Sequence, residues 1–205
     1  MPFIGNKPSA VPLTSADITD GIITSAKIAD GTIVNADINA SAGIVTSKLS
    51  GALGITEADQ FRLTTSYSGT NDSDITTNLE RNDNTAFSVL GTGMTQSSGV
   101  FTFPSTGYYY ITFTIDCDIG STDQNIYGFI QGTINNSTYI TQGTCRIGDE
   151  SNTHAGTATT SVIFDVTSTA NCKVKFATGS VGAGTVLGSS AQNTTFMTFI
   201  RLGDT

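Results

Sequence analysis

The chain has 205 residues, a formal net charge of −8 and only 13% charged residues, so it lacks the clustered Lys and Arg on which nucleic-acid binding depends. Hydrophobic residues make up 38% of the chain and include 11 Phe and 6 Tyr, a composition that excludes an entirely disordered protein. No segment approaches the length of about 18 apolar residues that a membrane span needs, and the first residues lack the pattern of a secretory signal.

Residues 1–50 are predicted to form an extended arm that contains a ten-residue repeat. Segments 15–24 and 25–34 align with each other, and shorter related pieces follow at 35–38 and 46–49. Each unit begins with a cap-type residue, a small residue and a charge, followed by Ile or Leu. The first residue of a unit predicts the N-cap of a single helical turn, the Asp-Gly pair that follows predicts a turn, and 31–34 is predicted as a short strand.

The apolar residues of this arm need a partner. Of the aromatic residues only Phe3 precedes Phe61, so the arm cannot build a core of its own. Repeats of this kind are covered by neighbours, either the same segment of sister chains or a surface of another protein. A disordered tail is the alternative, but the regular Ile spacing favours an ordered arm. The residues predicted to attach it to a particle are Phe3, Ile4, Ile18, Ile28, Ile33 and Ile38.

Residues 51–63 are predicted to form a short helical neck. Thr56 is a candidate N-cap, and Asp59 three residues later resembles a capping box, so a helix of one or two turns is expected within 53–63.

Residues 64–205 are predicted to form a mainly β domain, a jelly-roll β-sandwich. Short apolar runs alternate with turn clusters, which is typical of a sandwich. Gly179–Gly188 is glycine-rich without a phosphate-loop Lys, so a flexible loop is expected there. The predicted strands are 87–90, 100–103, 108–119, 125–134, 138–142, 157–166, 172–177 and 194–201.

The strand at 108–119 has the clearest alternation. The set expected to face the core contains Tyr109, Ile111, Phe113, Ile115 and Cys117. Tyr108, Tyr110 and Thr112 lie on the opposite face and are predicted to be buried at a contact between subunits, because tyrosine favours surfaces that are apolar on one side. Residues 84–115 and 176–200 carry no charge, and long uncharged strands are safe from edge pairing only when they are covered.

Catalytic, cofactor and metal sites are not expected. The single histidine, His154, lies in a polar stretch and is interpreted as a solvated loop residue. Asp116 and Asp118 share a strand face and are interpreted as a surface pair, with a weak calcium site and paired catalytic carboxylates as the alternatives. The cysteines are expected to be small buried hydrophobes rather than a metal site, with one disulfide and a leftover thiol as the alternative; they are Cys117, Cys145 and Cys172.

The segment from Phe101 through Gly107-Tyr108-Tyr109-Tyr110-Ile111-Thr112-Phe113 resembles the central signature of the C1q/tumour-necrosis-factor-like jelly roll. Ile111 replaces one aromatic of the pattern, and Met94 stands where an aromatic or Leu is usual. Residues 195–202 resemble the closing strand of that family. The resemblance covers about residues 85–205 and implies a C1q/TNF-like head that forms homotrimers.

The arm carries a second resemblance. Residues 2–6, 28–31, 35–42 and 47–49 look like N-terminal segments of virion structural proteins of tailed bacteriophages, and the join at 57–64 also resembles that group. This implies a trimeric protein of the virion surface, made in the host bacterial cytoplasm, in which the arm grips the particle and the head lies outside.

Several functions fit these expectations. The first is a capsid decoration or cement protein whose partner is the major capsid protein. The second is a short tail fibre or receptor-binding protein that contacts tail proteins and a host surface glycan. A non-viral C1q-like binding module and an enzyme are the remaining alternatives. No partner that is a nucleic acid or a membrane is expected.

Overall fold

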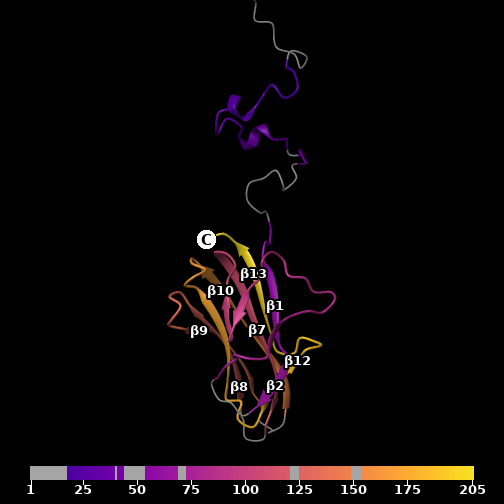
Figure 1. Cartoon of the computed structure of the whole chain (residues 1–205), viewed down its shortest axis with the longest axis vertical. Coiled ribbons are helices and arrows are strands. Elements are labelled where there is room, and N and C mark those ends of the chain that lie inside the picture. Colours follow the sequence, from indigo (N-terminus) through magenta and orange to yellow (C-terminus); the bar gives the residue numbers. More distant parts are fainter. Residues whose placement is uncertain (1–17, 40, 44–53, 69–72, 121–124, 149–153) are drawn as a thin grey trace, which may run out of the picture. The chain divides into compact units, whose positions relative to one another are not determined.

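In the computed structural model, the described residues are 18–39, 41–43, 54–68, 73–120, 125–148 and 154–205 (Figure 1). They belong to two units with separate internal contacts, the arm (Met1–Ser50) and the head (Gly51–Thr205). In these ranges, no helix has the length and apolar character needed to cross a bilayer.

The ten-residue repeat of the arm sequence is also a repeat of backbone structure. A turn closed by a 3.1 Å hydrogen bond from Ile22 N to Thr19 O recurs ten residues later, where Thr32 N donates to Ala29 O at 3.1 Å. Each turn contains a glycine with φ of 78°, a left-handed conformation that other residues rarely adopt.

A one-turn 3₁₀ helix follows each of these turns. The first, η2, covers Ser25–Lys27 and the second, η3, covers Asn35–Asp37. The predicted caps are off by one residue, because Thr24 is the N-cap of η2 and makes no side-chain capping hydrogen bond. The predicted strand at 31–34 is absent from the described arm, because a strand needs a pairing partner and the single arm offers none.

The head is a sandwich of two antiparallel sheets. Among the described residues, sheet A has the order β2-β12-β7-β13-β1-β4. Strands β12 and β13 pair with different parts of one edge of β7, and β10 pairs with the opposite edge. The bounds of its strands are β1 Ala58–Leu63, β2 Thr65–Ser68, β4 Leu79–Arg81, β7 Gly107–Ile119, β10 His154–Val166, β12 Thr185–Ser189 and β13 Phe196–Gly203.

Sheet B covers the inner side of sheet A. Its described strands have the order β5-β6-β11-β8-β9, and β3 also pairs with β11. The bounds are β3 Ser73–Asp74, β5 Thr95–Ser97, β6 Val100–Thr102, β8 Asn125–Thr133, β9 Ile140–Gly148 and β11 Lys173–Gly179. The predicted strand at 87–90 is wrong, since only Leu90 there makes a bridge, to Ala58.

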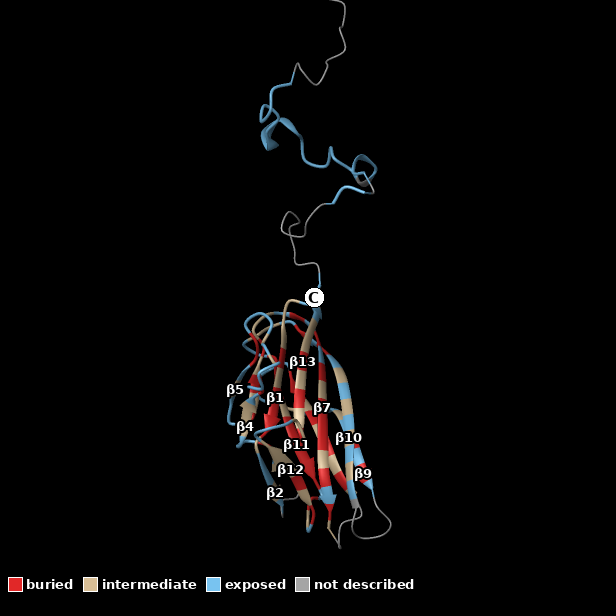
Figure 2. Cartoon of the chain, turned by 90° about the vertical axis from the view of Figure 1, so that its right-hand side faces the viewer, coloured by how far each residue is buried: buried red, intermediate tan, exposed pale blue. Residues whose placement is uncertain are grey.

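The core lies between the sheets and is built around β7. The predicted inward set of β7 is confirmed, because each of its five residues is at most 1% exposed. Phe113 touches Phe176 of sheet B, with ring centroids 5.1 Å apart. Figure 2 shows this buried stripe along β7 and the more exposed β10 beside it.

The predicted helical neck is wrong, because Ala58–Leu63 is strand β1 in the interior of sheet A. It pairs with β13 on one side and β4 on the other. Phe61 and Leu63 face the core, and this burial outweighs the weak capping signal at Thr56. The head therefore begins before residue 64.

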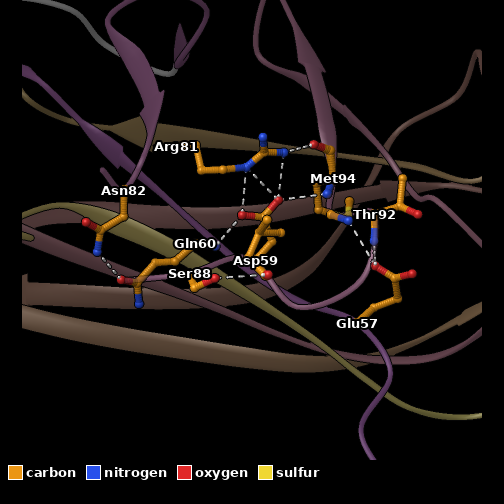
Figure 3. A network of polar contacts seen from close by, with 10 residues as sticks. Glu57, Asp59, Gln60, Arg81, Asn82, Ser88, Thr92 and Met94 are labelled. Carbon is orange, nitrogen blue, oxygen red and sulfur yellow. Dashed lines mark hydrogen bonds and ion pairs between the residues drawn. The ribbon is translucent and has the colours of Figure 1, made fainter. Parts of the chain in front are cut away.

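A network of polar contacts ties the segment after β4 to β1 (Figure 3). Asp59 is 2% exposed and forms an ion pair with Arg81, with a distance of 3.0 Å between Nε and Oδ1. Asp59 Oδ2 also accepts a 2.7 Å hydrogen bond from Met94 N, and Arg81 Nη2 donates to Met94 O at 2.6 Å. Glu57 Oε2 accepts the backbone N–H groups of residues 92 and 93 at 2.8 and 2.9 Å.

The predicted loop at Gly179–Gly188 contains most of strand β12. Val186 of this strand pairs with Cys117 of β7 on one side and with Tyr67 of β2 on the other. Val186 is completely buried, which explains why a glycine-rich segment is held as a strand.

Candidate functional site

The outward face of sheet A carries the tyrosines that the sequence analysis singled out. Tyr108 is 42% exposed and Tyr110 is 37% exposed, while Thr112 beside them is half-buried. They alternate with the core residues of β7, so all three side chains leave the sheet on the side away from sheet B.

Strand register extends this face across four strands. Tyr110 lies opposite Ile163 of β10 on one side and Ile200 of β13 on the other, and Ile200 lies opposite Ala58 of β1. Residues directly opposite each other in an antiparallel sheet point to the same face. These four residues, Ala58, Ile200, Tyr110 and Ile163, are called the apolar row below.

Tyr110 and Ile163 of the apolar row are exposed in the single chain, and Ala58 and Ile200 are half-buried. Ile163 at its β10 end is 67% exposed. Leu202, which lies at a bulge of β13 next to the row, is 51% exposed. The row thus aligns an aromatic and two large aliphatic residues across neighbouring strands of one sheet face.

The next row along the strands is polar and uncharged. It consists of Gln60, Thr198, Thr112 and Ser161 in adjacent strands. Gln60 Nε2 donates to Thr198 Oγ1 at 3.0 Å, so part of this row is already hydrogen-bonded within the chain. On the other side of the apolar row, Asp165 lies opposite Tyr108 and is exposed, so a partner that packs on this face meets this carboxylate at its edge.

Sequence reasoning found Tyr108, Tyr110 and Thr112 but missed Ile163 and Ile200. Ile163 follows Val162 directly, and Ile200 follows Phe199, so each was absorbed into a continuous apolar run. The alternation of side chains along each strand identifies them, because a residue next to a core residue points to the opposite face of the sheet.

The arm residues predicted to attach the protein to a particle are exposed wherever they are described. Ile18, Ile28, Ile33 and Ile38 are between 39% and 55% exposed. Ile22, Ile23 and Val34 are similarly open. Phe3 and Ile4 lie outside the described residues.

The acidic pair, Asp116 and Asp118, belongs to no metal-binding cluster of the described residues. Asp116 Oδ1 accepts a long 3.4 Å hydrogen bond from Thr157 Oγ1, and Asp118 is exposed. His154 is the first residue of β10 and lies opposite Ile119. Within the described ranges, no three His, Cys, Asp or Glu residues gather as metal ligands would.

The cysteines are free and buried, as predicted. Burial raises the pKa of the Cys117 thiol to about 12, and the neighbouring Asp116 contributes to the same shift. Burial also raises the pKa of Cys145. Both side chains are therefore neutral thiols that pack as small apolar groups at neutral pH.

Comparison with known proteins identifies the fold of the head. No protein-family model and no curated protein matches the chain. Among solved structures, Eiger TNF from S. frugiperda is 15% identical, with a TM-score of 0.55 over 75% of this chain and 96% of that chain. Murine APRIL is 10% identical, with a TM-score of 0.52 over 71% of this chain and 98% of that chain. The head has a TNF-like jelly-roll fold, which confirms the predicted fold class.

Proposed function

We propose that the chain is a non-enzymatic, homotrimeric structural protein of a bacteriophage virion surface, most simply a capsid decoration or cement protein. The heads associate through the outward face of sheet A, and the arms anchor the trimer to the particle. The observation that carries the proposal is the apolar row and the uncharged polar row beside it on the outward face of sheet A.

The trimer follows from the fold and from this face together. The TNF-like jelly roll commonly assembles as a homotrimer. Burying a side chain such as Ile163 contributes about 1.5–3 kcal/mol, and three equivalent contacts close a ring without leaving a free face. Tyr108 and Tyr110 suit such a contact because their rings bury area while their hydroxyls reach the wet rim.

The anchoring role rests on the arm. Its described apolar residues are exposed in every repeat unit, so the single chain gains nothing from them. Three arms that each bury several Ile side chains hold a trimer to a particle by avidity. The resemblance of the arm to N-terminal segments of tailed-phage structural proteins supports the virion as the site of attachment.

A short tail fibre or receptor-binding protein is the second candidate. It is favoured by the outward face of sheet B, where Tyr127 and Phe129 are half-buried and Arg146 is exposed without an ion pair among the described residues. Position on the particle separates the two roles: cryo-electron microscopy will find many copies on the head for a cement protein and a few copies at the tail for a fibre.

The subunit contact is tested by placing a charge in the apolar row. Ile163→Glu is expected to convert the trimer to monomers in light scattering, because the carboxylate would be buried without a partner. Ile163 is 67% exposed in the chain, so the head is expected to keep its fold, which circular dichroism will check. Thr95→Glu on exposed β5 of sheet B is the matched control and is expected to stay trimeric. A trimeric Ile163→Glu protein would contradict the proposed contact.

A further inference from the structure

The outward face of sheet B carries two parallel aromatic rings. Tyr127 and Phe129 alternate with the core residues of β8, so they point away from sheet A. Their ring centroids are 6.0 Å apart and their planes differ by 7°. The rings stack on each other and are half-buried, so solvent still reaches part of each ring.

The neighbouring strand leaves room beside these rings. Ala177 of β11 lies opposite Phe129, and Gly179 lies opposite Tyr127, so β11 offers no bulky side chain there. A hollow of about 200 Å³ results, and it is lined by Phe129, Gln131, Thr141 and Ala177. Pockets for drug-sized ligands measure about 300–1,000 Å³, so this hollow fits a single ring-sized group.

The polar groups around the hollow are available to a ligand. Within the described part of the chain, the Gln131 amide and the Thr141 hydroxyl make no hydrogen bond. Arg146 of β9 lies opposite Tyr127 and is exposed. It has no ion pair among the described residues, whereas Arg62, Arg81 and Arg201 all do.

We propose that this surface is a binding site for a saccharide that carries a carboxylate. The C–H face of a pyranose packs on a flat aromatic ring, and its hydroxyls hydrogen-bond to amide and hydroxyl side chains such as Gln131 and Thr141. Arg146 supplies the fork that pairs with a carboxylate through two hydrogen bonds. The site goes beyond the proposed structural role and does not depend on it.

Other ligand classes fit this surface less well. A nucleic-acid backbone needs several free cations. On the described outward face of sheet B, however, Lys175 is paired with Asp74 and Lys173 is buried, which leaves Arg146 as the exposed cation, and the chain has a net charge of −8. A second copy of the chain would need an apolar surface larger than one ring and a hollow. In a trimer built through sheet A, the outward face of sheet B stays free, so three sites would act together on a polymeric glycan.

Binding is tested by saturation-transfer NMR on the full-length protein. The probes are the methyl glycosides of glucose, galactose, glucuronic acid and galacturonic acid. We expect transfer to the ring C–H protons of at least one glycoside, with an acidic sugar bound at least several-fold more tightly than its neutral counterpart. Absence of transfer to all four glycosides at millimolar concentration would overturn the proposal.

Three variants locate the site. Phe129→Ala and Gln131→Ala are expected to abolish or strongly reduce transfer, and Arg146→Gln is expected to remove the preference for the acidic sugar. Thr95→Ala on β5 is the control and is expected to bind as the wild type does. Because Gln131 and Arg146 lie outside the core, their variants stay informative even if Phe129→Ala fails to fold.

The same samples separate this proposal from a subunit contact. Light scattering is expected to give the same mass for Arg146→Gln and Gln131→Ala as for the wild type. If these variants lost the trimer, sheet B would be the subunit contact and the saccharide site would be contradicted. If they stayed trimeric and bound sugar like the wild type, the saccharide site would be contradicted and the proposed trimer would stand.

Discussion

Phe113 is the residue on which the packing of the two sheets can be tested most simply. It is completely buried and touches Phe176 of the opposite sheet. Phe113→Ala is expected to lower the free energy of unfolding by about 3–5 kcal/mol, because the removed ring leaves a cavity that the sandwich cannot close. Urea unfolding will measure the change, and Thr95→Ala on exposed β5 is expected to stay within about 0.5 kcal/mol of the wild type.

Cys117 and Tyr67 are expected to lower the stability of the head at alkaline pH. Burial raises the pKa of Cys117 from 9.0 to about 12 and the pKa of Tyr67 from 10.0 to about 12. Above pH 9 the unfolded chain therefore releases protons that the folded chain keeps, and the free energy of unfolding falls as pH rises to about 12.

The test of this effect compares urea unfolding at several pH values between 8 and 11. One such group lowers stability by up to about 1.4 kcal/mol per pH unit within its window. Cys117→Ala is expected to show a shallower loss of stability with pH than the wild type does. An identical slope in both proteins would mean that the Cys117 thiol ionises as readily in the folded as in the unfolded state.

At the level of single residues, the sequence predicted which residues of β7 face the core, but it predicted only part of the outward face of sheet A. Five alternating apolar residues leave one choice of core face for a long strand, and the structure confirms it. Ile163 and Ile200 were missed because they stand next to Val162 and Phe199 in runs that are apolar throughout. Only the register of β10 and β13 against β7 shows that they extend the surface of Tyr110.

At the level of elements, β1 shows why local signals mislead. Thr56 and Asp59 have the spacing of a capping box, yet Asp59 serves instead as the buried partner of Arg81. The strand is held by neighbours that lie far away in sequence, since Ala58 pairs with Ile200. A pattern within ten residues cannot reveal pairing across more than a hundred.

Removal of Asp59, the centre of the polar network at β1, is expected to lower the free energy of unfolding. Asp59→Ala deprives Arg81 and Met94 N of their acceptor in a site where Asp59 itself is 2% exposed. The expected loss is about 3 kcal/mol, the lower end for a broken buried ion pair, because Arg81 is 39% exposed and keeps access to water. Thermal unfolding will measure it. Asp204→Ala, whose side chain is 89% exposed, is the control, and an equally small effect of both changes would contradict the structural role of Asp59.

In the arm, by contrast, the local repeat could be predicted from the sequence, but the partner of its apolar side chains could not. Its ten-residue period was evident from the sequence, because each unit repeats the same few residue types and the local turns need only those residues. What covers the Ile side chains was not predictable, since all the described apolar residues of the arm are exposed in the single chain.

At the level of the whole molecule, the two units are expected to divide anchoring and folding between them. The head has its own core and should fold without the arm, so a protein that begins at Ala52 is expected to be soluble and folded. This shortened protein is expected not to bind virus particles that lack the full-length protein, whereas the added full chain is expected to bind them. Equal binding of both proteins in a co-sedimentation assay would show that the arm is not the anchor.

The mass of the purified protein in solution tests the central claim most directly. Multi-angle light scattering at micromolar concentration is predicted to give three times the 21.3 kDa of one chain, and the head that begins at Ala52 is predicted to remain a trimer. Monomers of the full chain under these conditions would contradict an assembly built on the outward face of sheet A.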